Sequence, residues 1–583
     1  MPKQLLRKRL VPLFLTGAFF FGCFICYLTT LLTRGEDAAF EDFTRRIFCE
    51  QVSSNALNLH YTLADPETYD IEPPAPAFGS LSREAFDEGH LYLENQQTTL
   101  EQFDTSELSE DNRLTWDILF QYLRTELSND NQYIMGELLS PGLGIQAQLP
   151  VLLAEYTFRE ESDIQTYLQL LAQVENYFAE ILSFEQAKSS QGYFMNDTTL
   201  DGIISQCNTF LSDGNDNYLA RIFHRKLQDF PNLSTEQCDI YENEHTQILT
   251  QHVLPAYAQL VDGLELLRGT GTNQNGLYYY SNGQQYYTWL LQRTTGVYDS
   301  IPVIEKRLLG QLQQDQQSMY QLLQKHPDLT SQSLSLGQNA FSAEPGEMLG
   351  ELQEKMADDF PKSPSISYDI KYVDEDLQKH LSPAFYLTPP LDTLSPNTIY
   401  INPASGLTGL DLYTTLGHEG FPGHLYQTQY FAHTNPDPVR HLMNMGGYIE
   451  GWATYVESFA YRYADCDPAI SAAAWLNRSL NLCLFSICDV GIHYRGWTQA
   501  QTGTFLANFG ITDQQAVSNV FHSILADPAN YLKYYLGYLS FLDIRTRAET
   551  AAGDDFDMKK FHKNVLEIGP SQFPVLQKWL ESM

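Results

Sequence analysis

The stretch Gly417–Gln427, which reads GHEGFPGHLYQ, organises the chain because it brings two histidines and a glutamate close together. A zinc hydrolase commonly presents two imidazole ligands and, between them, a carboxylate that deprotonates metal-bound water. We therefore predict that His418 and His424 bind Zn²⁺ and that Glu419 is the general base. The alternative is two unrelated histidines at the ends of a broken helix.

The spacing of the two histidines departs from the common H-E-x-x-H pattern. His424 follows His418 by six residues, which places it about 120° away on an unbroken helix. Proline removes a backbone donor and glycine tolerates a displaced backbone. Pro422-Gly423 therefore predicts a break that allows both rings to face one point.

A second helix is predicted to supply the third ligand. Residues 445–463 place large apolar side chains at helical spacing, which indicates a core face. On the adjacent flank, Glu450 and Glu457 alternate with small residues that allow another helix to approach closely. We predict Glu450 as the third zinc ligand, the alternative being a solvated glutamate. Glu457 is either the ligand in its place or an acceptor that orients a histidine.

Three further residues are candidates for the reaction itself. His493 and Tyr534 are candidate donors to a developing oxyanion, and Asp489, one helical turn before His493, is a candidate to orient it. The alternatives are a core histidine with its own partners and tyrosines that pack the core.

The remaining pattern predicts a mainly α protein with a small β-sheet beside the active-site helix. Amphipathic helices run from residue 36 to about 267 and, after a loop rich in glycine, asparagine and tyrosine at 269–287, continue to about 325. Three short strands, at Ile366–Val373, Ala384–Leu387 and Thr398–Asn402, precede the motif. In a peptidase the edge strand of this sheet is suited to hold an extended peptide.

The N-terminus predicts attachment to a membrane. Residues 1–9 are basic, and Leu10–Leu32 form 23 residues without a charge, long enough to span a bilayer. We expect 1–34 to be a cytoplasmic tail and signal anchor, with cleaved secretion or lipidation at Cys23 as alternatives. Residues 35–583 form one extracellular unit, with a helical lobe at about 35–330 and a motif-bearing lobe at about 331–583.

The charge and the cysteine content argue against some classes of ligand. The net charge is −37 although the first 34 residues hold five basic residues and no acidic ones. Such a surface repels nucleic acid and anionic membranes. Six cysteines lie outside the anchor without C-x-x-C spacing, which argues against a cysteine metal site. Cys207 and Cys238 form either a disulfide or two buried thiols.

With these residues assembled, the chain resembles the bacterial family of unknown function numbered 885, whose signature is H-E-x-x-P-G-H. The matching stretches are His418–His424, Glu450–Ala453, Asp489–His493 with Gly496-Trp497, and Tyr534–Gly537 followed by Arg545. The resemblance implies a large, helical, two-lobed fold similar to the gluzincin metallopeptidases, in which two histidines of one helix and a glutamate of the next bind zinc.

Together these features predict a membrane-anchored, extracellular zinc metallopeptidase that cleaves short peptides. One alternative is an amidase acting on cell-wall peptides, which would use the same chemistry. The other is a metal-free surface binding protein, against which the intact His418, Glu419, His424 and Glu450 argue. The oligomeric state is left open.

Overall fold

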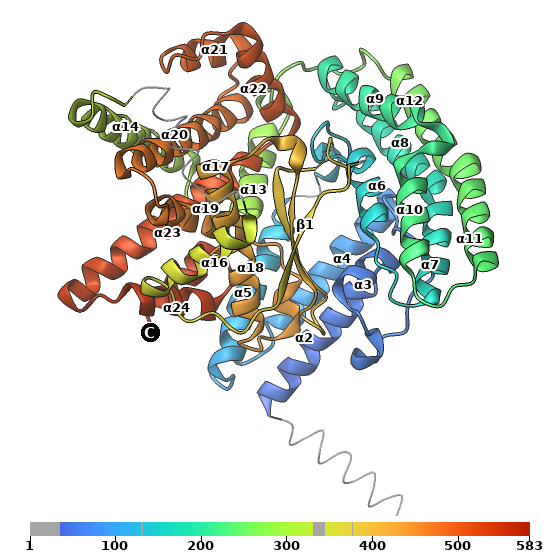
Figure 1. The fold of residues 1–583 in the computed structure, drawn as a ribbon, viewed down its shortest axis with the longest axis horizontal. Coiled ribbons are helices and arrows are strands. Elements are labelled where there is room, and N and C mark those ends of the chain that lie inside the picture. The colour runs from blue at the N-terminus through green and yellow to red at the C-terminus, as the bar shows by residue number, and fades with distance from the viewer. Residues whose placement is uncertain (1–34, 130–131, 330–343, 376, 380) are drawn as a thin grey trace, which may run out of the picture.

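The computed structural model describes residues 35–583 except 130–131, 330–343, 376 and 380. The described chain is mainly helical (Figure 1), as predicted. It opens with α2 (Glu36–Val52), α3 (Ala56–Thr62), α4 (Arg83–Leu100) and α5 (Glu110–Leu127). The expected membrane anchor lies outside the described residues, and within them no helix is both long and apolar enough to cross a bilayer.

A stack of helices lies to one side of the molecule and encloses its own hydrophobic core (Figure 1). Its helices are α6 (Ile145–Glu155), α7 (Glu161–Ala172), α8 (Val174–Ser190), α9 (Asp197–Ser212), α10 (Tyr218–Asp229), α11 (Thr235–Ile248) and α12 (Leu254–Leu266). A π turn at Leu249–Val253 joins α11 to α12. Cys207 and Cys238 are buried here as free thiols, so the disulfide alternative is not realised.

A larger core unites α2 and α5 with the helices of the C-terminal half, so helices on both sides of residue 330 contribute to it. These helices are α13 (Gly283–Thr295), α14 (Ile301–Lys325), α16 (Pro345–Lys355), α17 (Gly409–Glu419), α18 (His424–Ala432), α19 (Gly446–Tyr463), α20 (Pro468–His493), α21 (Gln499–Ala507), α22 (Gln514–Ala526), α23 (Asn530–Ala552), α24 (Met558–Ile568) and α25 (Phe573–Leu580). Trp452 of α19 is fully buried in it, as the apolar stripe predicts.

The predicted three-stranded sheet is present and lies between the two cores. Its strands are β1 (Tyr368–Tyr372), β2 (Ala384–Leu387) and β3 (Asn397–Ile401). The order is β1-β3-β2, with β3 parallel to β1 and antiparallel to β2. Ile399 packs in the larger core, whereas Phe385 and Tyr400 pack against the smaller one. The strand β2 is therefore an edge, and it lies beside α17.

Small residues set how closely α19 approaches its neighbours. A Cβ at Gly417 of α17 would lie 2.6 Å from the Cβ of Ala460, and a Cβ at Gly451 would lie 2.5 Å from the Cα of Gly537 in α23. The predicted small-residue flank thus holds α19 tightly against α17 on one side. A row of glycines does the same against α23.

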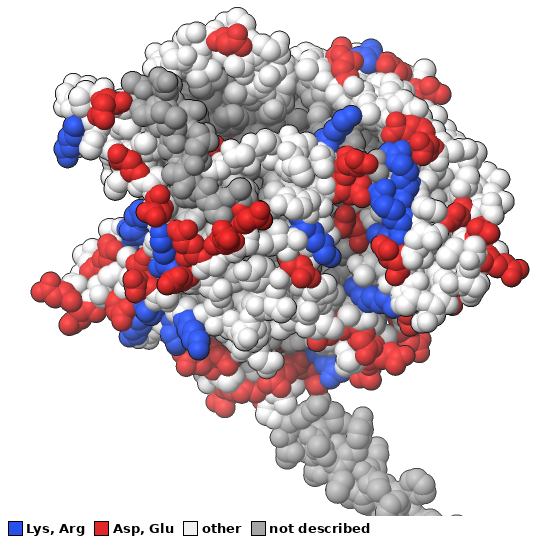
Figure 2. Space-filling view, viewed as in Figure 1, with Lys and Arg blue, Asp and Glu red and all other residues white. Residues whose placement is uncertain are grey.

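The surface reflects the charge imbalance of the sequence. On the face shown in Figure 2, acidic side chains are spread widely, and basic side chains occur singly or in small groups among them. No broad basic surface is visible on that face.

Candidate metal centre

The motif forms an elbow between two helices. Helix α17 ends at Glu419 and α18 begins at His424, so the predicted break at Pro422-Gly423 is confirmed. A Cβ at Gly423 would lie 1.8 Å from the carbonyl oxygen of His418, which only glycine avoids. Because the chain turns at this elbow, His424 at the start of α18 lies on the same side as His418 at the end of α17.

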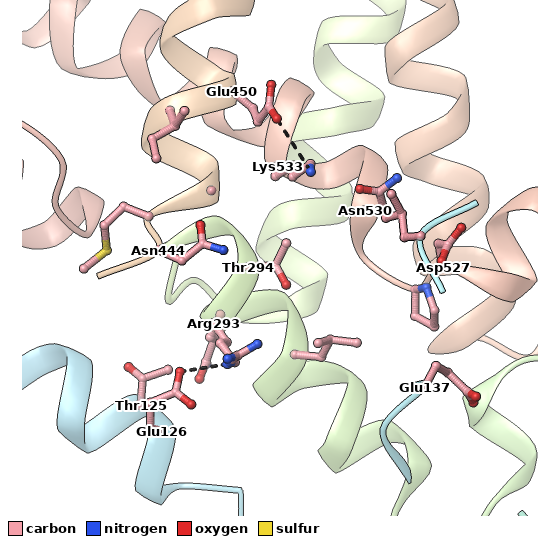
Figure 3. Close-up of a pocket in the computed structure, with 18 of the residues that line it drawn as sticks. Thr125, Glu126, Glu137, Arg293, Thr294, Asn444, Glu450, Asp527, Asn530 and Lys533 are labelled. Atoms are coloured by element: carbon pink, nitrogen blue, oxygen red, sulfur yellow. Dashed lines mark hydrogen bonds and ion pairs between the residues drawn. The ribbon is translucent and has the colours of Figure 1, made fainter. Parts of the chain in front are cut away.

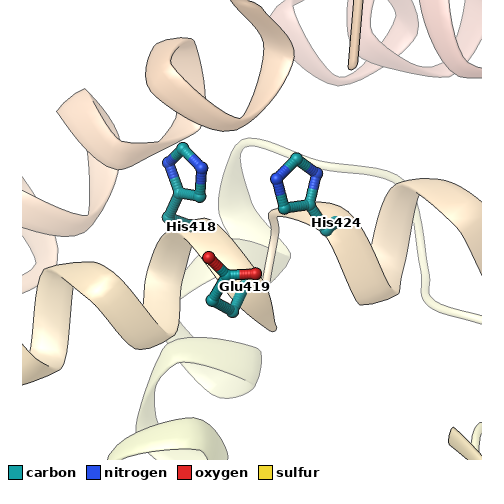
Figure 4. A group of neighbouring side chains, drawn as sticks. All are labelled: His418, Glu419 and His424. Atoms are coloured by element: carbon teal, nitrogen blue, oxygen red, sulfur yellow. The ribbon is translucent and has the colours of Figure 1, made fainter. Parts of the chain in front are cut away.

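The elbow brings the three motif side chains together. One ligand atom from each of His418, Glu419 and His424 lies within 4.8 Å of the other two. The imidazole centroids are 4.8 Å apart, with planes at 87°. Figure 4 shows both rings on the same side of the elbow, with Glu419 between them. The fold therefore places the two histidines, which stand on either side of the break, next to each other.

Glu450 reaches this cluster from the second turn of α19. Its Oε2 lies 3.6 Å from Nε2 of His418 and 3.5 Å from Nε2 of His424. All three side chains are largely buried. Burial works to raise the pKa of Glu450, but the two histidines and Lys533 outweigh it and hold that pKa well below its usual value. Glu450 is thus an ionised carboxylate facing two imidazole nitrogens.

Glu457 holds the opposite nitrogen of His418. Its Oε2 lies 3.3 Å from Nδ1 of that ring, and its Oε1 accepts a hydrogen bond of 3.1 Å from Nε of Arg478 on α20. Burial opposes a charged ring, yet Glu450, Glu457 and Glu419 together raise the pKa of His418 to about 10. Of its two predicted roles, Glu457 has the geometry of the orienting acceptor.

Helix α23 closes the site with two neighbouring side chains. Nζ of Lys533 lies 3.6 Å from Oε1 of Glu450, the oxygen that does not face the histidines. The ring of Tyr534 stacks at 27° to that of His418, with centroids 6.4 Å apart. Burial, followed by the charges of Glu450 and Glu419, raises the pKa of Tyr534. Tyr534 therefore keeps its proton and can donate a hydrogen bond at this site.

Glu419 is positioned by the edge of the sheet. Its Oε2 accepts a hydrogen bond of 3.0 Å from the backbone N–H of Tyr386 in β2. Burial raises the pKa of Glu419 in spite of the two nearby histidines. A carboxyl group with a raised pKa is suited to accept and return a proton.

The structure does not bring Asp489 and His493 to this cluster. Nδ1 of His493 accepts from the backbone N–H of Leu277, and its Nε2 lies 3.0 Å from the carbonyl oxygen of Ile524. Asp489 accepts from Tyr287 and from the backbone of Ala529 rather than from His493. Both side chains are fully buried, so they connect helices in the core.

Two charged partners of the site are absent from the sequence-based prediction. Lys533 stands directly before the predicted Tyr534, and this adjacency is the one signal that pointed toward it. Arg478 lies on α20, far along the chain from both glutamates, and nothing in its local pattern distinguishes it from a surface arginine.

Comparison with solved structures supports the fold. A protein from Colwellia psychrerythraea described as a "putative lipoprotein" superposes with a TM-score of 0.84 at 20% identity, covering 94% of this chain and 99% of its own. A "putative lipoprotein of unknown function" from Shewanella oneidensis gives 0.66 at 15% identity, covering 93% and 99%. At these identities the likeness concerns the fold alone. No curated protein matches the chain.

The family comparison covers nearly the whole described chain. The model of the family described as "Bacterial protein of unknown function (DUF885)" matches residues 74–580. This range includes every residue of the cluster and the cavity walls described below. The chain therefore belongs to the DUF885 family.

Proposed function

We propose that this protein is a zinc-dependent hydrolase, and specifically a metallopeptidase, in which His418, His424 and Glu450 hold the metal. The observation that carries the proposal is the convergence of three donor atoms. Two imidazole Nε2 atoms lie 3.6 and 3.5 Å from one carboxylate oxygen. Nitrogen and oxygen donors of this kind are those that catalytic zinc sites use.

The spacing of these atoms fits a metal better than a hydrogen bond. Ligands about 2.0–2.1 Å from a tetrahedral zinc ion lie about 3.3 Å from one another. The observed distances are close to this value and longer than the about 2.7–3.2 Å of a nitrogen–oxygen hydrogen bond. Glu457 favours a proton on Nδ1 of His418, so Nε2 is the nitrogen of that ring that would bind a metal in place of its own proton.

The chemistry assigns a role to each neighbouring residue. Zinc bound here would supply Lewis acidity and lower the pKa of a water molecule in the site. Glu419, held by Tyr386, takes the proton from that water and returns it to the leaving amine. Tyr534, which remains protonated, donates a hydrogen bond to the oxyanion of the substrate.

A peptide is the substrate that the surroundings favour. The edge strand β2 directs the N–H of Tyr386 toward Glu419, so the outer edge of the sheet borders the site. An extended peptide can add to such an edge through backbone hydrogen bonds. Cell-wall peptides present the same amide bond, and substrate profiling separates these two classes.

The N-terminal segment and the relatives suggest where the enzyme works. Residues 10–32 carry no charge, and both of these solved proteins are described as a "putative lipoprotein". A membrane or lipid tether with the catalytic body outside the cytoplasm accommodates both facts.

The test is the metal content of purified protein. About one zinc per chain is expected in the wild type and none in His424→Ala. His433→Ala is the matched control, because His433 lies at the end of the same helix with its Nδ1 2.7 Å from a backbone oxygen of α18; it should keep its zinc. The wild type should also cleave a peptide library. Zinc retained by His424→Ala would show that His424 is not a ligand. The absence of zinc from both proteins would favour a metal-free binding protein.

A further inference from the structure

A cavity of about 490 Å³ opens beside Glu450 (Figure 3). Its walls come from α5, the segment 135–143, α13, the start of α19, the junction of α22 with α23, and Gln572 near the C-terminus. This volume falls within the roughly 300–1,000 Å³ typical of small-molecule sites. The proposed metal ligand Glu450 forms part of its wall. A substrate that occupies the cavity therefore has its scissile bond close to the proposed metal ligands.

The cations in this cavity are already paired with acids. Nε of Arg293 lies 2.7 Å from Oε1 of Glu126, and Nζ of Lys533 lies 3.6 Å from Oε1 of Glu450. Figure 3 marks both pairs. Two further carboxylates, Glu137 and Asp527, line the cavity as well. They therefore leave the walls with an excess of negative charge.

Glu137 is backed by a buried charge cluster. Its Oε2 lies 2.5 Å from Nζ of Lys188, a lysine with no exposed surface. Beside Lys188 lies Glu185, which is fully buried and whose two carboxylate oxygens have no hydrogen-bond partner among the described residues. Glu137 therefore shares its lysine partner with a second acidic group, Glu185, whose pKa burial raises to about 7. About a third of the Glu137 side chain remains accessible, and it borders the cavity.

Asp527 has no cation partner of its own within the described residues. Burial raises its pKa against the effects of Ser140 and Lys533. Burial also raises the pKa of Glu137 against Lys188, and the charge of Asp527 adds to that rise. Two carboxylates that disfavour each other's ionisation are stabilised when a cation binds between them.

We propose that this cavity binds the ammonium-bearing end of a short peptide, with Glu137 and Asp527 as the recognising carboxylates. This inference rests on the proposed function, because it places the peptide beside the catalytic cluster. The cavity lies on one side of Glu450 and has room for only a few residues, so cleavage releases a short piece. The ammonium belongs either to the N-terminus or to a lysine side chain, since the two present the same chemistry.

The test measures binding without turnover. Trialanine, its N-acetyl form and an N-acetyl peptide containing one lysine are titrated calorimetrically into the full-length Glu419→Gln variant. Trialanine should bind at least about tenfold more tightly than N-acetyl-trialanine. If only the acetylated lysine peptide binds more tightly than N-acetyl-trialanine, the ammonium is that of a side chain. Equal binding of all three peptides would overturn the proposal.

Variants then assign the binding to the two carboxylates. Asp527→Asn should weaken trialanine binding about tenfold, leave N-acetyl-trialanine unaffected and keep the zinc content. Asp543→Asn, which removes an exposed carboxylate paired with Arg307 outside the cavity, is the control for overall charge. Glu137→Gln is the second variant. Unchanged ammonium selectivity in both Asp527→Asn and Glu137→Gln would contradict the assignment.

Because binding is measured without hydrolysis, selective binding by a protein that lacks zinc or activity would contradict the proposed function alone.

Discussion

Oε2 of Glu457 lies 3.3 Å from Nδ1 of His418, while Nε2 of the same ring faces Glu450. Glu457 thus orients the ring of a proposed ligand from the side opposite to Glu450. Partners of this kind typically contribute about 10–100-fold to metal affinity. We expect Glu457→Gln to weaken zinc binding by that factor while retaining a site, as measured by competition with a chelator.

Glu450→Ala is the comparison for that experiment. Removal of a proposed ligand should abolish stoichiometric zinc binding rather than weaken it. If Glu457→Gln and Glu450→Ala lost zinc to the same extent, Glu457 would have to be counted as a ligand. An unchanged affinity in Glu457→Gln would show that the contact with His418 contributes nothing to binding.

Glu419→Gln should retain zinc and lose nearly all turnover. The glutamine oxygen can still accept the N–H of Tyr386, so the side chain keeps its place but cannot take a proton. General-base catalysis contributes about 10²–10⁴-fold, and a fall in kcat of that size is expected with zinc content unchanged. The measurement is steady-state hydrolysis of a peptide identified from the library. Activity close to wild type would remove Glu419 as the base.

Much of the candidate cluster could be predicted because its signals are local. His418, Glu419 and His424 stand within one short stretch, and Pro422-Gly423 predicts the helix break that the structure shows. Glu450 stood out through the small residues beside it, which do allow close helix packing. The local sequence likewise predicted the three short strands to within two residues.

The remaining features depend on contacts between distant segments. Asp489 and His493 lie one turn apart on α20, which permits a contact but does not require one. Each instead pairs with groups on other segments, including Leu277 for His493. Arg478 and Lys533 approach the two glutamates only after α20 and α23 have packed against α19. The cavity is likewise not predictable from the sequence because its walls come from six separate segments, including Gln572 near the C-terminus.

Gly423→Ala should disrupt the elbow. Its Cβ would lie 1.8 Å from the carbonyl oxygen of His418 and 2.5 Å from that of Gly417, both rigid backbone atoms. Overpacking of this kind costs about 1–3 kcal/mol or more. The backbone shift should also displace His424 and lower zinc content. Gly350→Ala is the control, because Gly350 is an exposed position of α16 with open space around it, and the variant should gain up to about 1 kcal/mol of stability. Normal zinc content in Gly423→Ala would contradict this account of the elbow.

Asp489→Asn should change how stability depends on pH. Burial raises the pKa of Asp489 from 3.8 to about 7. Between these values the folded protein keeps a proton that the unfolded chain has lost, so this residue makes the wild type less stable as pH rises. The loss amounts to at most about 1.4 kcal/mol per pH unit. Asparagine cannot ionise, and its oxygen can still accept from Tyr287. In chemical denaturation, the variant should therefore gain about 2–3 kcal/mol relative to wild type between pH 5 and pH 8. Parallel pH profiles would mean that Asp489 is already ionised in the fold.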